Sequence, residues 1–128
     1  ITIANRTLEN AEKLSEFAGK IGLKADVLKI ENINDSAKKY DIIVNATSIG
    51  LKNEESVISL DGINEKTVVY DIVYMPMNTD FIKKAKENNA IVIYGYEMLL
   101  GQATRAFEIW HNMEAPYNTM KKALLGGF

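Results

Sequence analysis

Short apolar runs bounded by polar residues recur along the chain and predict β-strands. Such runs occupy residues 1–4, 25–30, 41–45, 67–74 and 90–94. The 41–45 run is continuously apolar between its polar ends, which is typical of a strand covered on both faces in a parallel sheet. Pro76 prevents the 67–74 run from continuing as a central strand, because proline has no N–H to donate to a sheet.

Apolar residues at helical spacing fill most of the segments between these runs. Over 8–20 the apolar positions are 8, 11, 14, 17 and 18, Ile21 continues the stripe, and Gly19 and Gly22 mark the helix end. We expect further helices from Asn78 or Thr79 to about Asn88, over 96–112 and over 117–125, with a polar loop at 31–35 and a brief helical turn at 36–40.

The two C-terminal helices each show an apolar face. The stripe of the longer helix is Leu99, Ala103, Ala106, Phe107 and Trp110, and the face of the last helix is Met120, Ala123 and Leu124, with Gly126 and Gly127 as its stop. Strands that alternate with helices predict an α/β fold around a parallel sheet. With 128 residues and no evident linker or repeat, the chain is expected to form one domain over 1–128.

Composition narrows the function classes. The net charge is −2, with 15 basic and 17 acidic residues well mixed, so no basic patch suited to nucleic acid is present. No apolar run approaches the length of a membrane span. There is no cysteine and a single histidine, His111, which argues against a thiolate or multi-histidine metal site. We therefore expect a soluble cytoplasmic protein with no membrane or nucleic-acid partner.

The polar residues after the first strand suggest a dinucleotide site. In a doubly wound fold the second strand ends at the adenosine ribose, where an acid selects NAD and an arginine meets the 2′-phosphate of NADP. Asn5, Arg6 and Thr7 stand there, with no acid before Glu9. A surface role is the alternative, because Thr7 is a good N-cap and Glu9 suits a first helical turn.

Polar and small residues also follow the other strands. They are Asn45, Thr47, Ser48 and Gly50 after the third run, Tyr74 and Asn78 after the fourth, and Gly95 and Met98 after the fifth. Ligands of open parallel sheets bind beyond the carboxyl ends of the strands, so this edge is the expected binding edge. Turns are rich in such residues in any case, so a single loop carries little weight.

Together these segments resemble the shikimate dehydrogenase family. The similar segments are NRT at 5–7, NATSIG at 45–50, DIVYMPMNT at 71–79 and GYEMLLGQATRAFEIW at 95–110. The resemblance covers the C-terminal NADP-binding domain of that family. It implies a Rossmann-like doubly wound parallel sheet, and the NADPH-dependent reduction of 3-dehydroshikimate to shikimate in aromatic amino acid biosynthesis.

The resemblance also assigns roles to residues. It implies that Asn5, Arg6 and Thr7 clamp the 2′-phosphate, that Thr47 and Ser48 line the cofactor near its nicotinamide half, and that Ile72, Gly95 and Met98 lie at the nicotinamide end. It implies that Tyr74 and Gln102 bind substrate. Met98, Gln102 and Arg105 share a helix face offset from the apolar stripe, which supports a cleft position for Gln102. A solvated helix residue is the alternative.

The chain departs from the family pattern at two places. Asn10 stands where the family commonly has a second cation for the phosphate, so selectivity against NAD is open. The first strand and its glycine-rich turn are absent. In the 3-2-1-4-5-6 order that strand lies at the centre of the sheet, so the 1–4 and 41–45 strands lack their shared partner. Such edges pair with something: the sheet closes up, a homodimer forms, or a preceding segment completes it.

No catalytic residue is expected in this chain. The resemblance places the family's catalytic Lys and Asp in an N-terminal substrate domain, and hydride transfer to a ketone needs an acid/base group at the oxygen. Asp71 is the best internal candidate, although acids at strand ends are usually structural. We expect a fragment that is inactive alone. The alternatives are a quinate/shikimate dehydrogenase, for which an acid would be expected near position 6, and a non-catalytic binding or assembly module.

Overall fold

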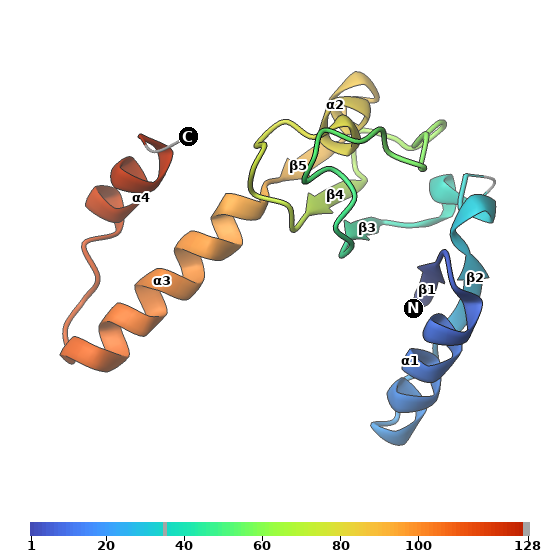
Figure 1. Cartoon of the computed structure of the whole chain (residues 1–128), viewed down its shortest axis with the longest axis horizontal. Coiled ribbons are helices and arrows are strands. Elements are labelled where there is room, and N and C mark those ends of the chain that lie inside the picture. The colour runs from blue at the N-terminus through green and yellow to red at the C-terminus, as the bar shows by residue number, and fades with distance from the viewer. Residues whose placement is uncertain (35, 127–128) are drawn as a thin grey trace.

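The computed structural model describes residues 1–34 and 36–126, which form helices and parallel strands in alternation (Figure 1). The strands are β1 (Thr2–Asn5), β2 (Asp26–Lys29), β3 (Ile42–Asn45), β4 (Val68–Asp71) and β5 (Ile91–Ile93). The helices are α1 (Leu8–Lys20), α2 (Asp80–Glu87), α3 (Gly95–His111) and α4 (Tyr117–Leu125), with 3₁₀ turns at Ile30–Asn32 and Ala37–Lys39. The predicted α/β class and element order are confirmed.

The strands form two separate parallel sheets, of order β1-β2 and β3-β4-β5. In the first, Asn5 pairs with Lys29; in the second, Asn45 pairs with Asp71 and Tyr70 with Ile93. Within the described residues β1 and β3 are not paired with each other, so the sheet does not close up. This is the arrangement expected of a Rossmann-like sheet without its central strand. Figure 1 shows α1, β1 and β2 at one end of the molecule, α3 and α4 at the other, and the second sheet between them.

Two strands are shorter than the sequence predicts, for local reasons. β2 ends at Lys29 because the chain turns into the 3₁₀ helix that begins at Ile30. β4 ends at Asp71, although the apolar run continues to Tyr74. The N–H of Val73 donates to the Asp71 side chain at 3.0 Å instead of to a neighbouring strand. The Gly127 part of the expected helix stop and the Asp35 end of the polar loop lie outside the described residues.

The hydrophobic core lies between the second sheet, α2 and the 58–63 segment. Its buried members are Ile33, Ala37, Ile43, Ile58, Leu60, Ile63, Val69, Phe81 and Ala85. α2 begins where predicted, because the Thr79 hydroxyl accepts the N–H of Ile82 at 3.2 Å and caps the helix. The core thus holds the carboxyl ends of β3 and β4 against the start of α2.

Several apolar residues that the sequence predicts to be buried are exposed in this structure. Ala11 and Ala18 of α1 are buried, but Leu14, Phe17 and Ile21 are more than half exposed. Only one face of β3 is covered, since Ile42 and Val44 are exposed while Ile43 is buried. The physical reason is the same: among the described residues, no element packs on these faces of α1 and β3.

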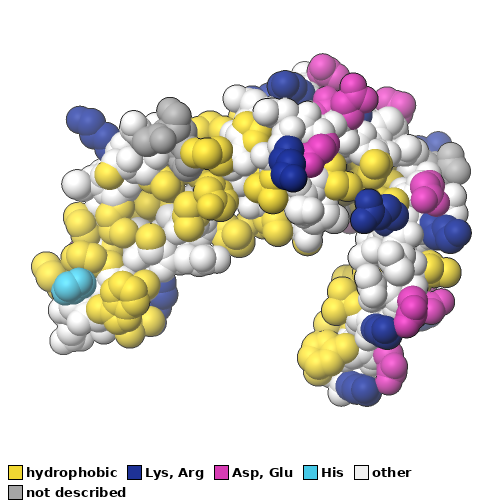
Figure 2. All heavy atoms as spheres, in the orientation of Figure 1, with side chains coloured by type: hydrophobic (Ala, Val, Ile, Leu, Met, Phe, Trp, Pro, Cys, Tyr) yellow, Lys and Arg dark blue, Asp and Glu magenta, His cyan; other side chains and the backbone are white. Residues whose placement is uncertain are grey.

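The α3 stripe is also only partly covered. Leu99 and Ala103 line an apolar groove with Met120, Ala123 and Leu124, so the predicted face of α4 does meet α3. Trp110, at the other end of the stripe, is 78% exposed. Figure 2 shows hydrophobic side chains spread over the α3 and α4 part of this view.

Candidate functional site

The carboxyl ends of β3 and β4 are joined through the side chain of Asn45. Its Nδ2 donates to Asp71 Oδ1 at 2.9 Å and to the Ile49 carbonyl at 3.1 Å. Its Oδ1 accepts from the N–H and the hydroxyl of Thr47, at 3.1 and 2.7 Å. Asn45 and Asp71 are both buried. This amide therefore fixes the loop after β3 to the end of β4.

Asp71 has a structural role in this arrangement. Its Oδ2 accepts the Thr79 hydroxyl at 2.6 Å, and its Oδ1 accepts from Asn45 and from the N–H of Val73. The side chain is fully buried, and no cation of the described part of the chain forms an ion pair with it. A buried carboxylate held by such donors is part of the structural framework, which is the usual role of an acid at a strand end.

The loop from Thr47 to Glu54 is fixed at both ends. The Thr47 hydroxyl accepts the N–H of Ile49 at 3.1 Å. Gly50 has φ of +106°, and a Cβ there would lie 3.0 Å from Thr79 Cγ2, so glycine is needed for both reasons. Glu54 Oε2 accepts the N–H groups of Lys52 and Gly50, and these bonds, that from Lys52 first, lower the pKa of Glu54. Ser48 lies exposed between these fixed points.

Three predicted cofactor residues come together where β4 ends and α3 begins. Gly95 is buried, and a Cβ on it would lie 2.6 Å from the backbone oxygens of Ile72 and Val73. Ile72 is half-buried and donates its N–H to the Asn45 carbonyl at 3.1 Å. Met98 follows Gly95 on the first turn of α3 and is 38% exposed. The structure thus places Ile72 and Gly95 in backbone contact at the edge that also holds Thr47.

The two predicted substrate residues lie on exposed positions of neighbouring segments. Tyr74 is 43% exposed, on the segment between β4 and α2. Gln102 is exposed one turn beyond Met98 on α3, and Arg105 on the same face donates to Glu108 at 3.2 Å. Gln102 is therefore not a core residue. On the neighbouring strand β4, burial first and then the charge of Glu97 raise the pKa of Tyr70.

The predicted phosphate clamp lies on the other sheet, at the carboxyl end of β1. Asn5 Oδ1 accepts the N–H of Thr7 at 2.9 Å, which turns the chain into α1. Thr7 occupies the N-cap position of α1, as the alternative interpretation expects. Its side chain makes no capping hydrogen bond. Arg6 is exposed, and in the described residues no carboxylate lies within ion-pair distance of its guanidinium. Asn10 is exposed on the first turn of α1.

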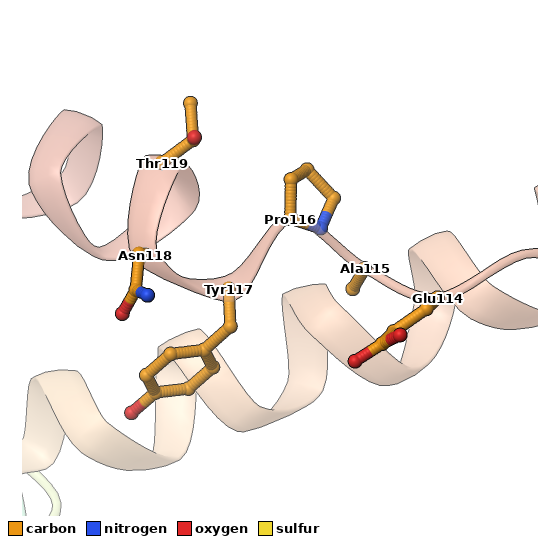
Figure 3. A pocket seen from close by; sticks show the side chains of 6 residues that line it. All are labelled: Glu114, Ala115, Pro116, Tyr117, Asn118 and Thr119. Carbon is orange, nitrogen blue, oxygen red and sulfur yellow. The ribbon is translucent and has the colours of Figure 1, made fainter.

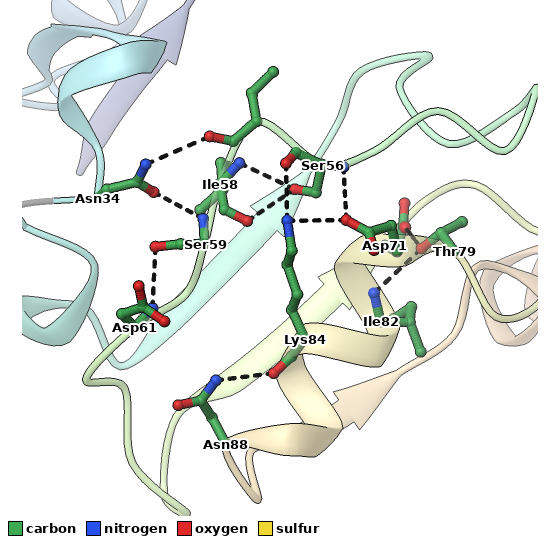
Figure 4. A network of polar contacts seen from close by, with 12 residues as sticks. Asn34, Ser56, Ile58, Ser59, Asp61, Asp71, Thr79, Ile82, Lys84 and Asn88 are labelled. Carbon is green, nitrogen blue, oxygen red and sulfur yellow. Dashed lines mark hydrogen bonds and ion pairs between the residues drawn. The ribbon is translucent and has the colours of Figure 1, made fainter.

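A second polar network ties the segment around Ser56 to the start of α2 (Figure 4). Asp80 Oδ2 accepts the N–H of Ser56 at 2.8 Å and pairs with Lys84 Nζ at 2.9 Å. Lys84 Nζ also donates to the Ser56 carbonyl at 3.0 Å. The side-chain bond from Lys84, followed by the Ser56 N–H, lowers the pKa of Asp80. Asn34 Oδ1 accepts the N–H of Ser59 at 2.9 Å. The 56–59 segment is thus bonded to α2 through Ser56 and to Asn34 through Ser59.

The hollows of the surface lie elsewhere. One of about 400 Å³ is open to solvent at the connection of α3 to α4 and is lined by residues 114–119 (Figure 3). An apolar groove of about 300 Å³ lies between α3 and α4. Neither contains a predicted site residue.

Among residues 1–34 and 36–126, no group of three or more His, Asp or Glu side chains is placed to hold a metal ion. No helix of those residues is long and apolar enough to cross a membrane.

Sequence reasoning missed the groups that build the edge. Asn45 was noted only as a polar strand end, and Thr79 only as a helix cap; their shared contact with Asp71 was not anticipated. The signal was a strand that ends in Asn and is followed by Thr two residues later, paired with a strand that ends in Asp. Glu54 and Asp80, which fix the loops on either side, gave no comparable signal.

Comparisons with known proteins agree with this fold and with the order of the motifs. Residues 1–93 match the family described as Shikimate / quinate 5-dehydrogenase, and residues 95–125 match the Shikimate 5′-dehydrogenase C-terminal domain. The chain therefore belongs to the shikimate/quinate dehydrogenase family, within the class of Rossmann-like α/β proteins.

Particular relatives are similar over the whole chain. The shikimate dehydrogenase (NADP(+)) of Nitrosopumilus maritimus is 73% identical over 128 residues, which is all of this chain and 47% of that protein. The enzyme of the same name from Methanocaldococcus jannaschii is 38% identical, with 98% and 46% covered. Shikimate 5-dehydrogenase from Listeria monocytogenes, solved with shikimate and NAD, has a TM-score of 0.84 at 32% identity, with 97% and 46% covered. The chain spans about half the length of the curated relatives it matches.

Proposed function

We propose that this chain is the NADP-binding part of a shikimate dehydrogenase. Such an enzyme reduces 3-dehydroshikimate to shikimate with NADPH, and we propose that it acts on these small molecules in the cytoplasm. The proposal is supported most by one arrangement at the carboxyl edge of one parallel sheet. Ile72 and Gly95 approach each other closely there, and Thr47 is bonded to Asn45 at the end of β3. That edge is where open α/β sheets bind nucleotides.

The residues present suit NADP at the adenosine end. Arg6 offers an exposed guanidinium without an ion-pair partner among the described residues, and a 2′-phosphate is a fitting anion for it. Asn5 holds the turn that presents Arg6, since its side chain accepts the Thr7 N–H. An acid near position 6 would favour NAD instead, and none precedes Glu9. With Asn10 in place of a second cation, Arg6 carries most of this selectivity.

The other predicted residues would hold the reacting end. Thr47 and Ser48 would line the cofactor, with Ile72, Gly95 and Met98 at its nicotinamide, and NADPH supplies the hydride when bound. Tyr74 and Gln102 would orient the substrate with a phenol and an amide. Asp71 is committed to Asn45, Val73 and Thr79, so the proton at the substrate oxygen would come from a group outside these 128 residues. Alone, the chain would therefore be inactive.

The test is an assay of the full-length protein, expressed from the gene that contains this sequence. Shikimate oxidation is followed at 340 nm with NADP⁺ and with NAD⁺, and quinate is used as the second substrate. The proposal expects turnover of shikimate that is faster with NADP⁺. A protein that binds neither dinucleotide would be a non-catalytic module, and turnover of quinate with NAD⁺ in preference would make it a quinate dehydrogenase.

A further inference from the structure

The side chain of Asn45 uses its whole hydrogen-bonding capacity inside the protein. An asparagine amide has two N–H donors and an oxygen that accepts two bonds. Here both donors are taken, by Asp71 and by the Ile49 carbonyl, and the oxygen accepts twice from Thr47. The side chain is 8% exposed, so none of these bonds is readily replaced by water. Asn45 is therefore a structural centre and not a ligand of a bound molecule.

Its bonds connect three segments at the carboxyl end of the second sheet. The 46–50 loop is attached to Asn45 at Thr47 and at Ile49, while Asp71 attaches Asn45 to the end of β4 and, through Thr79, to the start of α2. The Thr47 hydroxyl has its proton on Asn45 and accepts the Ile49 N–H. Its one donor and one of its two acceptor sites are thus already used within the loop.

We propose that Asn45 is a positioning residue for the cofactor site, and that Thr47 acts there through Asn45. The amide sets the 46–50 loop, with Thr47 and Ser48, against the 71–73 segment that carries Ile72. This inference rests on the proposed function, because it assumes that a dinucleotide binds at this edge. It assigns to Asn45 and Asp71 a role in binding without direct contact with the ligand.

A double-mutant cycle in the full-length protein tests the inference. The variants are Asn45→Ala, Thr47→Val and the two together, and the probe is NADP⁺ titrated by calorimetry well below every melting temperature. Thr47→Val breaks the hydroxyl bond to Asn45 and should bind NADP⁺ about tenfold more weakly, the loss expected for one broken buried hydrogen bond. Asn45→Ala removes all four bonds of the amide and should lose at least as much affinity. The double variant should lose no more affinity for NADP⁺ than the more affected single variant, because both substitutions remove the bond between Asn45 and Thr47.

A control variant separates positioning from general loss of stability. Ile63→Ala removes a buried core side chain that makes none of these bonds, and it should lower the melting temperature while leaving the affinity for NADP⁺ unchanged. If Asn45→Ala fails to fold, Thr47→Val still breaks the hydroxyl bond to Asn45 and should by itself show the tenfold loss. Additive losses in the cycle, or an Asn45→Ala protein with wild-type affinity, would overturn the inference.

Hydrogen exchange distinguishes this outcome from failure of the proposed function. The amides of Thr47 and Ile49 donate to Asn45 and Thr47, so Asn45→Ala should speed their exchange by about tenfold or more without any cofactor present. Faster exchange in a protein that binds no NADP⁺ would overturn the proposed function while the loop-setting role stands. Unchanged exchange at both amides would overturn the positioning role itself.

Discussion

Gly95 lies so close to Ile72 that no side chain fits between them. A Cβ on Gly95 would stand 2.6 Å from the Ile72 carbonyl oxygen, and equally close to that of Val73. The contact is between two backbones, so neither partner can move aside by a change of rotamer. It fixes the first turn of α3, and with it Met98 and Gln102, to the end of β4.

Gly95→Ala should therefore destabilise the protein and displace α3. Overpacking of this kind costs about 1–3 kcal/mol, and here backbone has to shift. The matched control is Gly101→Ala on the same helix, where nothing lies within 4 Å of an added Cβ and stability should stay equal or rise by up to about 1 kcal/mol. Urea unfolding of both variants measures the difference. Equal stability of the two would show that the close approach of Gly95 and Ile72 is not tight in solution.

Arg6→Ala should weaken NADPH far more than NADH. Loss of a charge-assisted bond to the 2′-phosphate costs roughly 1.5–3 kcal/mol, and NADH has no such group. Lys13→Ala, which removes an exposed cation of the neighbouring helix that pairs with Glu9, is the control and should affect neither cofactor. Fluorescence titration of the full-length protein with both cofactors decides. Equal losses for NADPH and NADH would assign Arg6 a structural role.

Gln102→Ala and Tyr74→Phe should impair substrate use more than cofactor binding. Each removes a polar group proposed to face the substrate, at a cost of about 1–3 kcal/mol in kcat/KM if the partner group is left unpaired. Kinetics with shikimate and NADP⁺ varied separately measure the two effects. If Gln102 is a solvated helix residue, its variant will match the wild type in both. A defect confined to NADP⁺ would move both residues to the cofactor site.

The Asp80 network should make stability depend on pH in the acid range. Because Lys84 and the Ser56 N–H lower the pKa of Asp80 below its ordinary value of 3.8, the folded state favours the carboxylate. The stabilisation is complete above that ordinary value and is lost as the pH falls through the lowered pKa. Asp80→Asn should thus be less stable than the wild type at pH 6, and the difference should shrink below about pH 4. Melting curves from pH 3 to 6 test this, and a gap that stays constant would contradict it.

The pattern of the sequence predicts local structure better than it predicts burial. Helix and strand positions follow from spacing, and α4 lies over the predicted residues. The prediction of buried residues was wrong where an apolar stripe needs a neighbouring element that the described residues do not supply. Phe17 and Trp110 are examples, because they are 59% and 78% exposed. The separate sheets agree with the expected lack of a central strand, which follows from family topology and not from residue pattern.

The sequence predicts that the site lies at the strand ends, but it does not predict the hydrogen bonds that connect those ends. Polar residues after strands indicate an edge, because parallel strands end on the same side. They do not reveal that Asn45 reaches Asp71 across paired strands, since such a contact depends on register and rotamer. The family resemblance indicates residues that would touch a ligand. The structure adds Asn45, Asp71 and Thr79, whose hydrogen bonds connect the segments that carry those residues.

Activity of a chimeric enzyme tests the central claim most directly. This chain replaces the matching part of the Nitrosopumilus maritimus shikimate dehydrogenase, to which it is 73% identical over 128 residues. The chimera should oxidise shikimate with NADP⁺, whereas the isolated 128-residue chain should give no turnover above the buffer blank. Turnover by the isolated chain would show that it contains its own acid/base group. A folded chimera that neither binds NADP⁺ nor turns over shikimate would contradict the assignment of this chain as the cofactor-binding part.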